Sequence, residues 1–334
     1  MNLKLRVPAA VSAVAFAVVA GAALVLATGG DPLTAYGQIA VGALAPGNLP
    51  NTLGWAVPLA GMALVAAIPL RGGMVNLGGD GQLVVGGLTA ALVPLHLGPS
   101  GILACPVAML LAMLAAGLYA ALAAWGEVMA GVPMLISSLL LSYPAVGLAS
   151  YLVGFPLRDR SSGLPQTPMI PDAARLPPLG DALSVGAFAV LAVAVVFVVF
   201  DRRSVAGYEL RMRGLNARFA RYGGVALGRQ AIGAMVASGA VAGLTGSVIV
   251  LGAQFRFTDG ALISPNYTWS GLMAALLAGG EPLGTLAGAL FFAALQTGGF
   301  AMQRETAVPR VLTMALQAMV ILFLAARHGL RRAP

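Results

Sequence analysis

Long uncharged stretches of apolar residues alternate with short polar segments along the whole chain. The stretches lie near residues 7–28, 51–70, 82–97, 102–124, 132–154, 182–200, 230–251, 267–280, 283–300 and 308–326. A hydrocarbon core about 30 Å thick is crossed by a helix of roughly 20 apolar residues. No stretch shows the run of about ten alternating residues that is typical of a strand in a membrane barrel. The pattern therefore predicts an all-α, multi-pass membrane protein with about ten transmembrane helices.

Two of the stretches, at 82–97 and 267–280, are short, which is typical of transporter helices that are broken or do not fully cross the membrane. The segments 78–80 and 279–281 both read Gly-Gly followed by an acidic residue, and an apolar stretch follows each of them. Inverted repeats are common in transporters. In a chain with 44 glycines, chance explains this match as well as an internal repeat does.

The composition agrees with lipid as the main solvent. Hydrophobic residues make up 59% of the chain and charged residues 9%, against about 45–50% and about 25% in soluble domains. Soluble and disordered chains are therefore excluded. The single cysteine rules out a cysteine-based metal cage, and the only lysine, Lys4, lacks the preceding glycines of a phosphate-binding P-loop. We expect no catalytic residues, no metal and no cofactor.

The net charge of +8 carries information about topology. With the N-terminus inside, ten spans place thirteen basic and five acidic residues inside, and six of each outside. Basic residues gather on the cytoplasmic side of membrane proteins, so the sequence predicts N-in/C-in. The run 7–28 exceeds the core of about 7–15 residues in a signal peptide, so we expect a retained helix. The basic charge indicates topology and contact with membrane lipid, and not nucleic acid.

Two segments outside the spans are long enough to matter. The outer segment, about 155–180, carries six prolines, which predict an extended and irregular loop. The inner segment, about 201–230, holds seven of the 19 basic residues. Neither is long enough for a soluble domain. The chain 1–334 is therefore predicted to be a single transmembrane domain.

The segment 71–82 interrupts apolar sequence with glycines and with Asn76, Asp80 and Gln82. Non-helical backbone at membrane depth survives only against protein or a water-filled cavity. One interpretation is a break in a helix that shapes a polar translocation path. The other is a cytoplasmic turn in which Asp80 caps a helix that begins near Gln82. Both interpretations stay open.

The segment 204–224 has the pattern of a short, capped, basic helix. Asn216 is a candidate N-cap and Gly223 a candidate C′ residue, and they enclose a helix over 217–222. Arg218 and Arg221, three residues apart, would share one face. Such a helix either docks into a soluble partner or contacts anionic lipid. The glycine spacing around it favours docking, because lipid contact requires no specific turn.

At these two segments the sequence resembles the permease subunits of ATP-binding-cassette (ABC) importers for nucleosides and simple sugars, a family related to ribose and branched-chain amino acid permeases. Residues 73–83 read GMVNLGGDGQL, where the family reads like GLFNIGGEGQL. Residues 207–225 read GYELRMRGLNARFARYGGV, where the family has a similar Glu-Leu-Arg pattern followed by Asn-Pro. Further matches stand at 238–246 and 280–284, and the resemblance runs from about Asp31 to Ala325.

The resemblance implies a permease with an inverted-repeat core in the cell inner (plasma) membrane. It implies a separate cytoplasmic ATP-binding subunit that hydrolyses ATP, a second permease subunit that often makes a heterodimer, and an extracytoplasmic substrate-binding protein that meets the outer loop. The residues that would contact the ATPase are Gly207, Tyr208, Glu209, Arg211, Gly214, Asn216, Ala217, Arg218, Ala220, Arg221 and Tyr222. The cargo would be a nucleoside or a simple sugar.

Polar and aromatic residues near the predicted breaks are candidates for the translocation path. They are Asn76, Asp80, Gln82, Ser138, Ser142, Tyr143 and Trp269, with Ser137, Gln254 and Gln296 as further candidates. Such side chains also commonly bond to a neighbouring helix or lie at the membrane interface. Three residues depart from the family pattern, namely Asp80 for Glu, Ala217 for Pro and Ser142 for Asn. The last change weakens any assignment of cargo.

Two alternatives accompany this interpretation. Glu127, at a cytoplasmic helix end, either pairs with an arginine of the inner segment or is a solvated charge, and the solvated charge is favoured because surface pairs contribute only about 0–1 kcal/mol. The alternative function is a secondary transporter driven by an ion gradient. Such proteins carry ionisable residues within their spans, and these spans are almost free of them.

Overall fold

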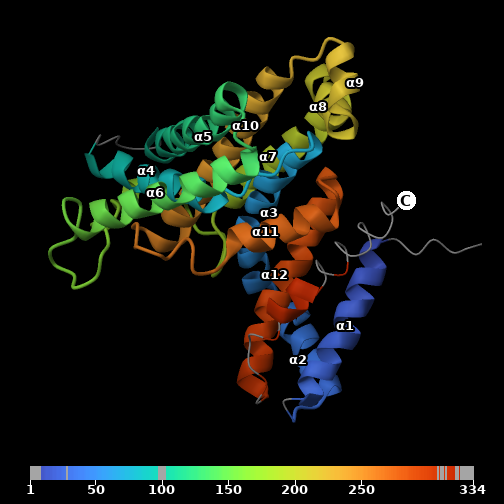
Figure 1. Cartoon of the computed structure of the whole chain (residues 1–334). Coiled ribbons are helices and arrows are strands. Elements are labelled where there is room, and N and C mark those ends of the chain that lie inside the picture. Colours follow the sequence, from blue (N-terminus) through green and yellow to red (C-terminus); the bar gives the residue numbers. More distant parts are fainter. Residues whose placement is uncertain are drawn as a thin grey trace, which may run out of the picture.

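The computed structural model describes residues 9–27, 29–96 and 103–306, together with 308, 312, 314–319 and 323 (Figure 1). The helices are α1 (Ala9–Ala27), α2 (Pro32–Leu44), α3 (Leu49–Arg71), α4 (Gly79–His96), α5 (Ala104–Ala130), α6 (Met134–Gly154), α7 (Gly186–Arg203), α8 (Val205–Leu215), α9 (Ala217–Tyr222), α10 (Leu227–Ile249), α11 (Tyr267–Leu277) and α12 (Pro282–Glu305). A π-helical turn, Val250–Gln254, continues α10. Within the described residues there is no β-strand, which confirms the all-α prediction.

Nine of the ten predicted apolar stretches contain a helix. The tenth, 308–326, falls largely outside the described residues. In the part of the chain that the structure describes, α3, α5, α6, α12 and α10 with its π-helical turn are long and apolar enough to cross a membrane. The pair α1 and α2 adds a sixth crossing if the two are counted as one bent span. The helix α11 has only 11 residues, as the short stretch at 267–280 predicts.

The helix α2 is an element that the hydrophobic pattern did not predict. The side chain of Asp31 caps it by accepting hydrogen bonds from the amides of Leu33 and Thr34. The helix buries Ile39 and Gly42 against α12, where a Cβ on Gly42 would lie 2.2 Å from the Cβ of Ala301. Thirteen residues are too few for a membrane span, so the search for long apolar runs passed over this helix.

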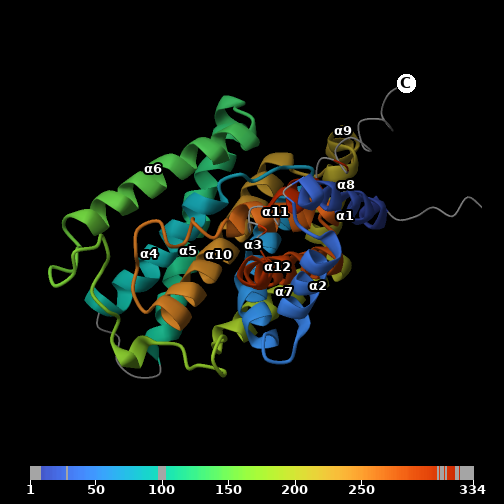
Figure 2. The ribbon, with the colours of Figure 1, turned by 90° about the horizontal axis from the view of Figure 1, so that it is seen from below.

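Close packing of small residues forms the centre of the bundle around α10. A Cβ on Gly243 of α10 would lie 2.2 Å from the carbonyl oxygen of Ala112 in α5. On another side, a Cβ on Gly86 of α4 would lie 2.3 Å from the Cα of Gly243. Small residues let helix backbones approach this closely in membranes. Accordingly α10 is the most buried of the five spans, and α6, at the edge of the bundle in Figure 2, is the least buried.

The loop 155–180 lies at the opposite end of α7 from α8 and α9 (Figure 1). It is irregular as predicted, apart from one short 3₁₀ turn at Asp172–Ala174. The amides of Thr167 and Ile170 donate to the carbonyls of Phe257 and Phe255 at 2.9 and 2.8 Å. These bonds tie the loop after α6 to the segment after α10.

Candidate functional site

Two short helices, α8 and α9, fill the inner segment 201–230. The hydroxyl of Ser204 caps α8 by accepting from the amide of Gly207 at 2.9 Å. The side chain of Asn216 caps α9 by accepting from the amide of Phe219 at 3.0 Å. The prediction of a helix over 217–222 with Asn216 as its N-cap is therefore confirmed.

The C′ position at the C-terminal end of α9 lies one residue later than predicted. Gly223 is the C-cap and has φ −74°, so it does not adopt the left-handed conformation expected of a C′ glycine. Gly224 does, with φ +87°. The amides of Gly224 and Val225 donate to the carbonyls of Arg221 and Ala220, both at 3.0 Å, which is a complete Schellman closure. The assignment of C′ to Gly223 was wrong, and Gly224 occupies that position.

The outer face of α9 is exposed and carries both basic and aromatic side chains. Arg218 and Arg221, which are three residues apart on this helix, are both exposed. Phe219 and Tyr222 are 60% and 92% exposed, whereas Ala220 is buried beneath them. Large aromatic residues and arginine are the residue types that dominate protein interfaces. This face therefore has the chemistry of a docking surface.

Two glycines allow α8 to lie directly on the ends of α7 and α3. A Cβ on Gly207 would lie 2.2 Å from the carbonyl oxygen of Phe200 in α7. A Cβ on Gly214 would lie 2.2 Å from the carbonyl oxygen of Arg71 at the end of α3. Any side chain at these positions would push α8 away from the membrane helices. The glycine spacing noted in the sequence is thus a packing requirement.

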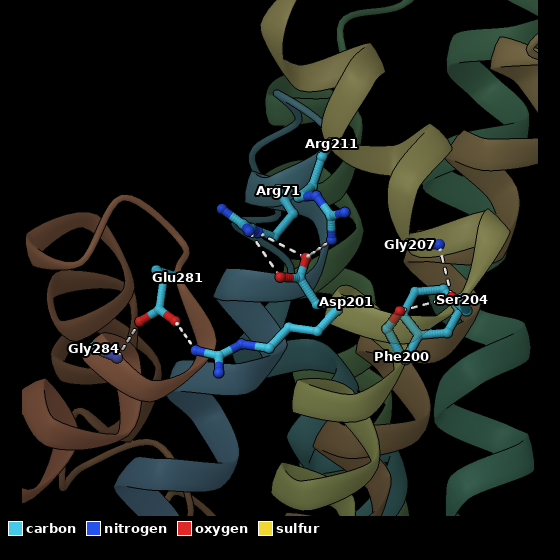
Figure 3. A network of polar contacts seen from close by, with 9 residues as sticks. Arg71, Phe200, Asp201, Ser204, Gly207, Arg211, Glu281 and Gly284 are labelled. Carbon is cyan, nitrogen blue, oxygen red and sulfur yellow. Dashed lines mark hydrogen bonds and ion pairs between the residues drawn. The ribbon is translucent and has the colours of Figure 1, made fainter.

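A network of ion pairs links α8 to α7, and α7 in turn to α3 and α12 (Figure 3). The guanidinium of Arg71 donates to both oxygens of the buried Asp201 carboxylate at 2.9 and 2.8 Å, and Arg211 of α8 lies 3.5 Å from the same carboxylate. Arg202 pairs with Glu281 at 3.3 Å, and Glu281 in turn caps α12 by accepting from the amide of Gly284 at 2.6 Å. The ends of α3, α7 and α12 are therefore linked around α8.

Three further contacts bind α8 to α5 and α10. Arg213 donates to the carbonyl of Leu227 at 2.8 Å and lies 3.6 Å from the carboxylate of Glu127 in the last turn of α5. Gln230 donates to the carboxylate of Glu209 at 2.7 Å. The favoured interpretation of Glu127 as a solvated charge was wrong, because its carboxylate pairs with an arginine of the inner segment.

The segment between α3 and α4 is a break held by side chains. The amide of Leu77 donates to the hydroxyl of Ser138 at 3.0 Å, and the amide of Gly78 donates to the side chain of Asn76 at 2.8 Å. Beyond it, the amide of Gly81 donates to the hydroxyl of Ser142 at 3.4 Å. Non-helical backbone inside a membrane bundle needs such partners, because no lipid group replaces them.

The side-chain amides of Asn76 and Gln82 form hydrogen bonds with other protein groups. The Asn76 amide donates to Gln82 and to the hydroxyl of Ser238, both at 2.9 Å, and Gln82 donates back to Asn76 at 3.2 Å. Both residues are buried, as are Ser138 and Ser142. These four candidates for the path thus support the shape of the break.

Asp80, Tyr143 and Trp269 do not hold the break, and among the further candidates the buried Oε1 atoms of Gln254 and Gln296 have no hydrogen-bond partner in the described residues. Asp80 is the second residue of α4, which begins at Gly79, so it is not the N-cap and the capping interpretation was wrong. Its Oδ1 atom is buried and has no hydrogen-bond partner among the described residues. Tyr143 on α6 and Trp269 on α11 are 68% and 44% exposed. Ser137, by contrast, donates to the carbonyl of Ala123 at 3.1 Å.

The contacts among Arg71, Asp201 and Arg211 were missed in the sequence. Asp201 lies 130 residues from Arg71, and no local pattern connects them. The one available sign was an acidic residue at the inner end of a span, directly before Arg202 and Arg203.

Comparison with known protein families identifies the family of this chain. The family described as branched-chain amino acid transport system / permease component matches residues 48–325, which include the break and the inner segment. The chain belongs to this permease family.

Three similar proteins are ABC transporter permeases. The glucose ABC transporter permease protein TsgB13 of Haloferax volcanii is 33% identical over 328 residues, covering 94% of this chain and 85% of that protein. The guanosine permease NupP of Bacillus subtilis is 28% identical, covering 80% and 78%. The nucleoside permease NupB of Lactococcus lactis is 26% identical, covering 98% and 93%. This chain is an ABC transporter permease of the inner (plasma) membrane, a family that works with an ATPase subunit and a substrate-binding protein.

Proposed function

We propose that the permease is the membrane subunit of an ATP-driven importer and that its α8–α9 segment is the coupling site for a separate ATPase subunit. The observation that carries this is the contrast between the two helices. The surface of α9 is free, whereas α8 is fastened to α3, α5, α7 and α10 by ion pairs, a hydrogen bond and close glycine contacts. A force applied to α9 is therefore passed to the membrane helices.

The predicted coupling residues divide by role. Arg218, Arg221 and Tyr222 would contact the ATPase directly, and Tyr208, which is 55% exposed, extends that surface. Of the remaining residues, Arg211 lies 3.5 Å from the Asp201 carboxylate, and the helices are positioned by Gly207, Glu209, Gly214, Asn216, Ala217 and Ala220.

ATP binding and hydrolysis on the partner would bias the permease between outward-open and inward-open states. The break between α3 and α4 lies directly beyond the contact of Gly214 with Arg71, so α8 is placed to move it. Asp80, Tyr143 and Trp269 would face the cargo, with Asn76, Gln82, Ser138 and Ser142 holding the break in shape.

The assembly follows from the same proposal. The chain would form a single domain with about ten spans, an inverted-repeat core and both termini inside, which puts α9 in the cytoplasm and loop 155–180 outside. The arginine-rich inner segment supports this orientation. A second, related permease chain would complete the path as a heterodimer, and the binding protein would deliver cargo to the outer loop.

The cargo would be a nucleoside or a simple sugar. The relatives named above are permeases for glucose, for guanosine and for nucleosides. A sugar ring with neighbouring hydroxyls is common to these compounds. A carboxylate such as Asp80 accepts hydrogen bonds from hydroxyls, and aromatic faces such as Trp269 stack on rings, which suits this class.

The test is purification of the tagged permease from its native cells in mild detergent, followed by identification of bound proteins and an assay of ATP hydrolysis. We expect an ATPase to co-purify with the wild-type chain. Changing Arg218→Glu together with Arg221→Glu should abolish its binding, because two attractive charges on the docking face become repulsive. The control is Arg160→Glu on the outer loop, which should retain the ATPase. A permease that purifies alone under several gentle conditions would contradict the proposal.

A further inference from the structure

A cavity of about 240 Å³ lies between the end of α3, the C-terminal half of α8 and the turn between α11 and α12. Its lining consists of Leu70, Arg71, Arg211, Gly214, Leu215 and Gly279. Two of these six residues are arginines, two are glycines and none is acidic. The cavity therefore presents positive charge inside a partly apolar wall.

The charges around this cavity do not balance. Arg71 binds both oxygens of Asp201 at 2.9 and 2.8 Å, so that carboxylate is already occupied by one guanidinium. Arg211 reaches the same carboxylate only at 3.5 Å, and no other acceptor for Arg211 exists among the described residues. The neighbouring acid, Glu281, is committed to Arg202 and to the amide of Gly284. Two arginines thus share one negative charge, and Arg211 keeps most of its five donors free.

Figure 3 shows Arg211 descending from α8 onto the Asp201 carboxylate from the side opposite to Asp201's own helix, next to Arg71. Two glycines line the cavity beside the two arginines, so no side chain projects into it at these positions. Gly214 packs on the carbonyl of Arg71, and Gly279 has φ +62°, a conformation that disfavours most residues with a side chain. The space is therefore maintained by positions at which a side chain is disfavoured.

The cavity is continuous with the proposed docking face. Leu215, one of its lining residues, is 82% exposed and directly precedes the Asn216 cap of α9. The lining of the cavity therefore reaches the residue next to the start of α9. The apolar rim formed by Leu70 and Leu215 excludes water around a group that enters, which strengthens its pairing with an arginine.

We propose that this cavity receives an acidic side chain of the ATPase subunit, whose carboxylate pairs with Arg211 and with the free edge of Arg71. The proposal rests on the proposed function, because it requires that an ATPase docks on α9. One surplus positive charge matches the single negative charge of a carboxylate better than the higher charge of a phosphate group. The entering carboxylate competes with Asp201 for Arg211, so docking alters the network at the end of α3.

The experiment measures the dissociation constant between the purified ATPase subunit and the permease in lipid nanodiscs, at low and at high salt. Arg211→Gln should weaken binding about tenfold and reduce its salt dependence, because a charge-assisted pair is lost. Arg211→Lys keeps the charge without the forked geometry and should show a smaller loss. The matched control is Arg203→Gln, an exposed arginine outside the cavity lining, which should bind within about twofold of wild type.

A charge-reversal step separates pairing from a purely structural role of Arg211. Arg211→Glu should abolish binding, and reversing one acidic residue on the ATPase surface to arginine should restore it. If no reversal restores binding, or if Arg211→Gln binds as wild type does, the proposal is wrong while the coupling site stands. If the wild-type permease fails to bind the ATPase at all, the proposed function itself fails.

Lipid composition tests the other source of negative charge. Nanodiscs of phosphatidylcholine alone and nanodiscs that also contain phosphatidylglycerol should give the same Arg211→Gln effect. An effect that appears only with phosphatidylglycerol would mean that a lipid headgroup occupies the cavity, and it would overturn the proposal.

Discussion

The segments 78–80 and 279–281 share a sequence pattern and differ in almost every structural respect. At 279–281, both glycines have positive φ, +62° and +75°, and Glu281 is the N-cap of α12. At 78–80, neither glycine has positive φ, and Asp80 lies inside the first turn of α4. The first is a tight turn that needs glycine for its backbone conformation. The second is a break that needs glycine because neighbouring helices leave no room.

The difference extends to the acidic residues. Glu281 accepts from the amide of Gly284 and pairs with Arg202, so its charge is used for structure. Asp80 has a buried oxygen without a partner in the described part of the chain. The backbone amides at the break are instead bonded by the side chains of Asn76, Ser138 and Ser142. A shared motif therefore conceals one carboxylate with a structural role and one whose Oδ1 atom is left without a partner among the described residues.

The largest expected effect comes from removing the side chain that holds the break. Asn76→Ala leaves the Gly78 amide and the Gln82 and Ser238 side chains short of partners, and each buried unpaired group costs about 1–3 kcal/mol. We expect a total loss of about 3 kcal/mol in the free energy of unfolding in mixed micelles. Asn51→Ala, an exposed asparagine at the start of α3, is the control and should change little. A loss no larger than the control's would show that the break is held in another way.

Glycine replacements separate the two segments by mechanism. A Cβ on Gly78 would lie 2.8 Å from the Ser138 carbonyl oxygen, so Gly78→Ala should cost about 2 kcal/mol through overpacking. Around Gly280 the nearest atoms are 3.4 Å from a Cβ, so Gly280→Ala should cost only about 1 kcal/mol, through its left-handed backbone. Asparagine tolerates that conformation, and Gly280→Asn should recover part of the loss whereas Gly78→Asn should not. The free energy of unfolding of the four variants tests this. Equal losses at Gly78 and Gly280, with the same response to asparagine, would refute the different roles of the two glycines.

The smallest effect on stability distinguishes the two acids. Glu281→Ala should cost about 1 kcal/mol because the cap is lost, and Glu281→Gln should retain most of the stability. Asp80→Asn should leave stability equal or higher, since a partly buried carboxylate becomes neutral. Uptake of guanosine or glucose in proteoliposomes with the ATPase and binding protein should nevertheless fall about tenfold for Asp80→Asn, as for one lost hydrogen bond. Normal uptake in that variant would remove Asp80 from the path.

Local features such as helix caps could be predicted from the sequence at the level of single residues. Asn216 and the bounds of α9 followed from capping rules, because an N-cap and its helix interact over three residues. The placement of the break followed from polar residues in apolar sequence. The outcome for Gly223 shows the limit of such rules, since two adjacent glycines both satisfied the pattern and backbone geometry chose Gly224.

Contacts between distant segments were not readable. The bond from Arg71 to Asp201 and the pair of Glu127 with Arg213 each join helices whose spatial relation depends on the whole bundle. Asn76 and Gln82 are only six residues apart, yet their mutual bonding requires the chain to fold back across the break. Polar residues that bond to each other and polar residues that meet cargo have the same appearance in a sequence, and only the fold separates them.

The caps at both ends of α9 have a consequence for the energetics of assembly. A six-residue helix is not stable by itself in water, because nucleation costs more entropy than so few hydrogen bonds recover. Here the Asn216 cap, the Schellman closure at Gly224 and the buried Ala220 hold the helix in shape before any partner arrives. An ATPase that docks on α9 as proposed would meet a preorganised surface, would lose little binding energy to ordering the chain, and would find the same contact shape at each rebinding.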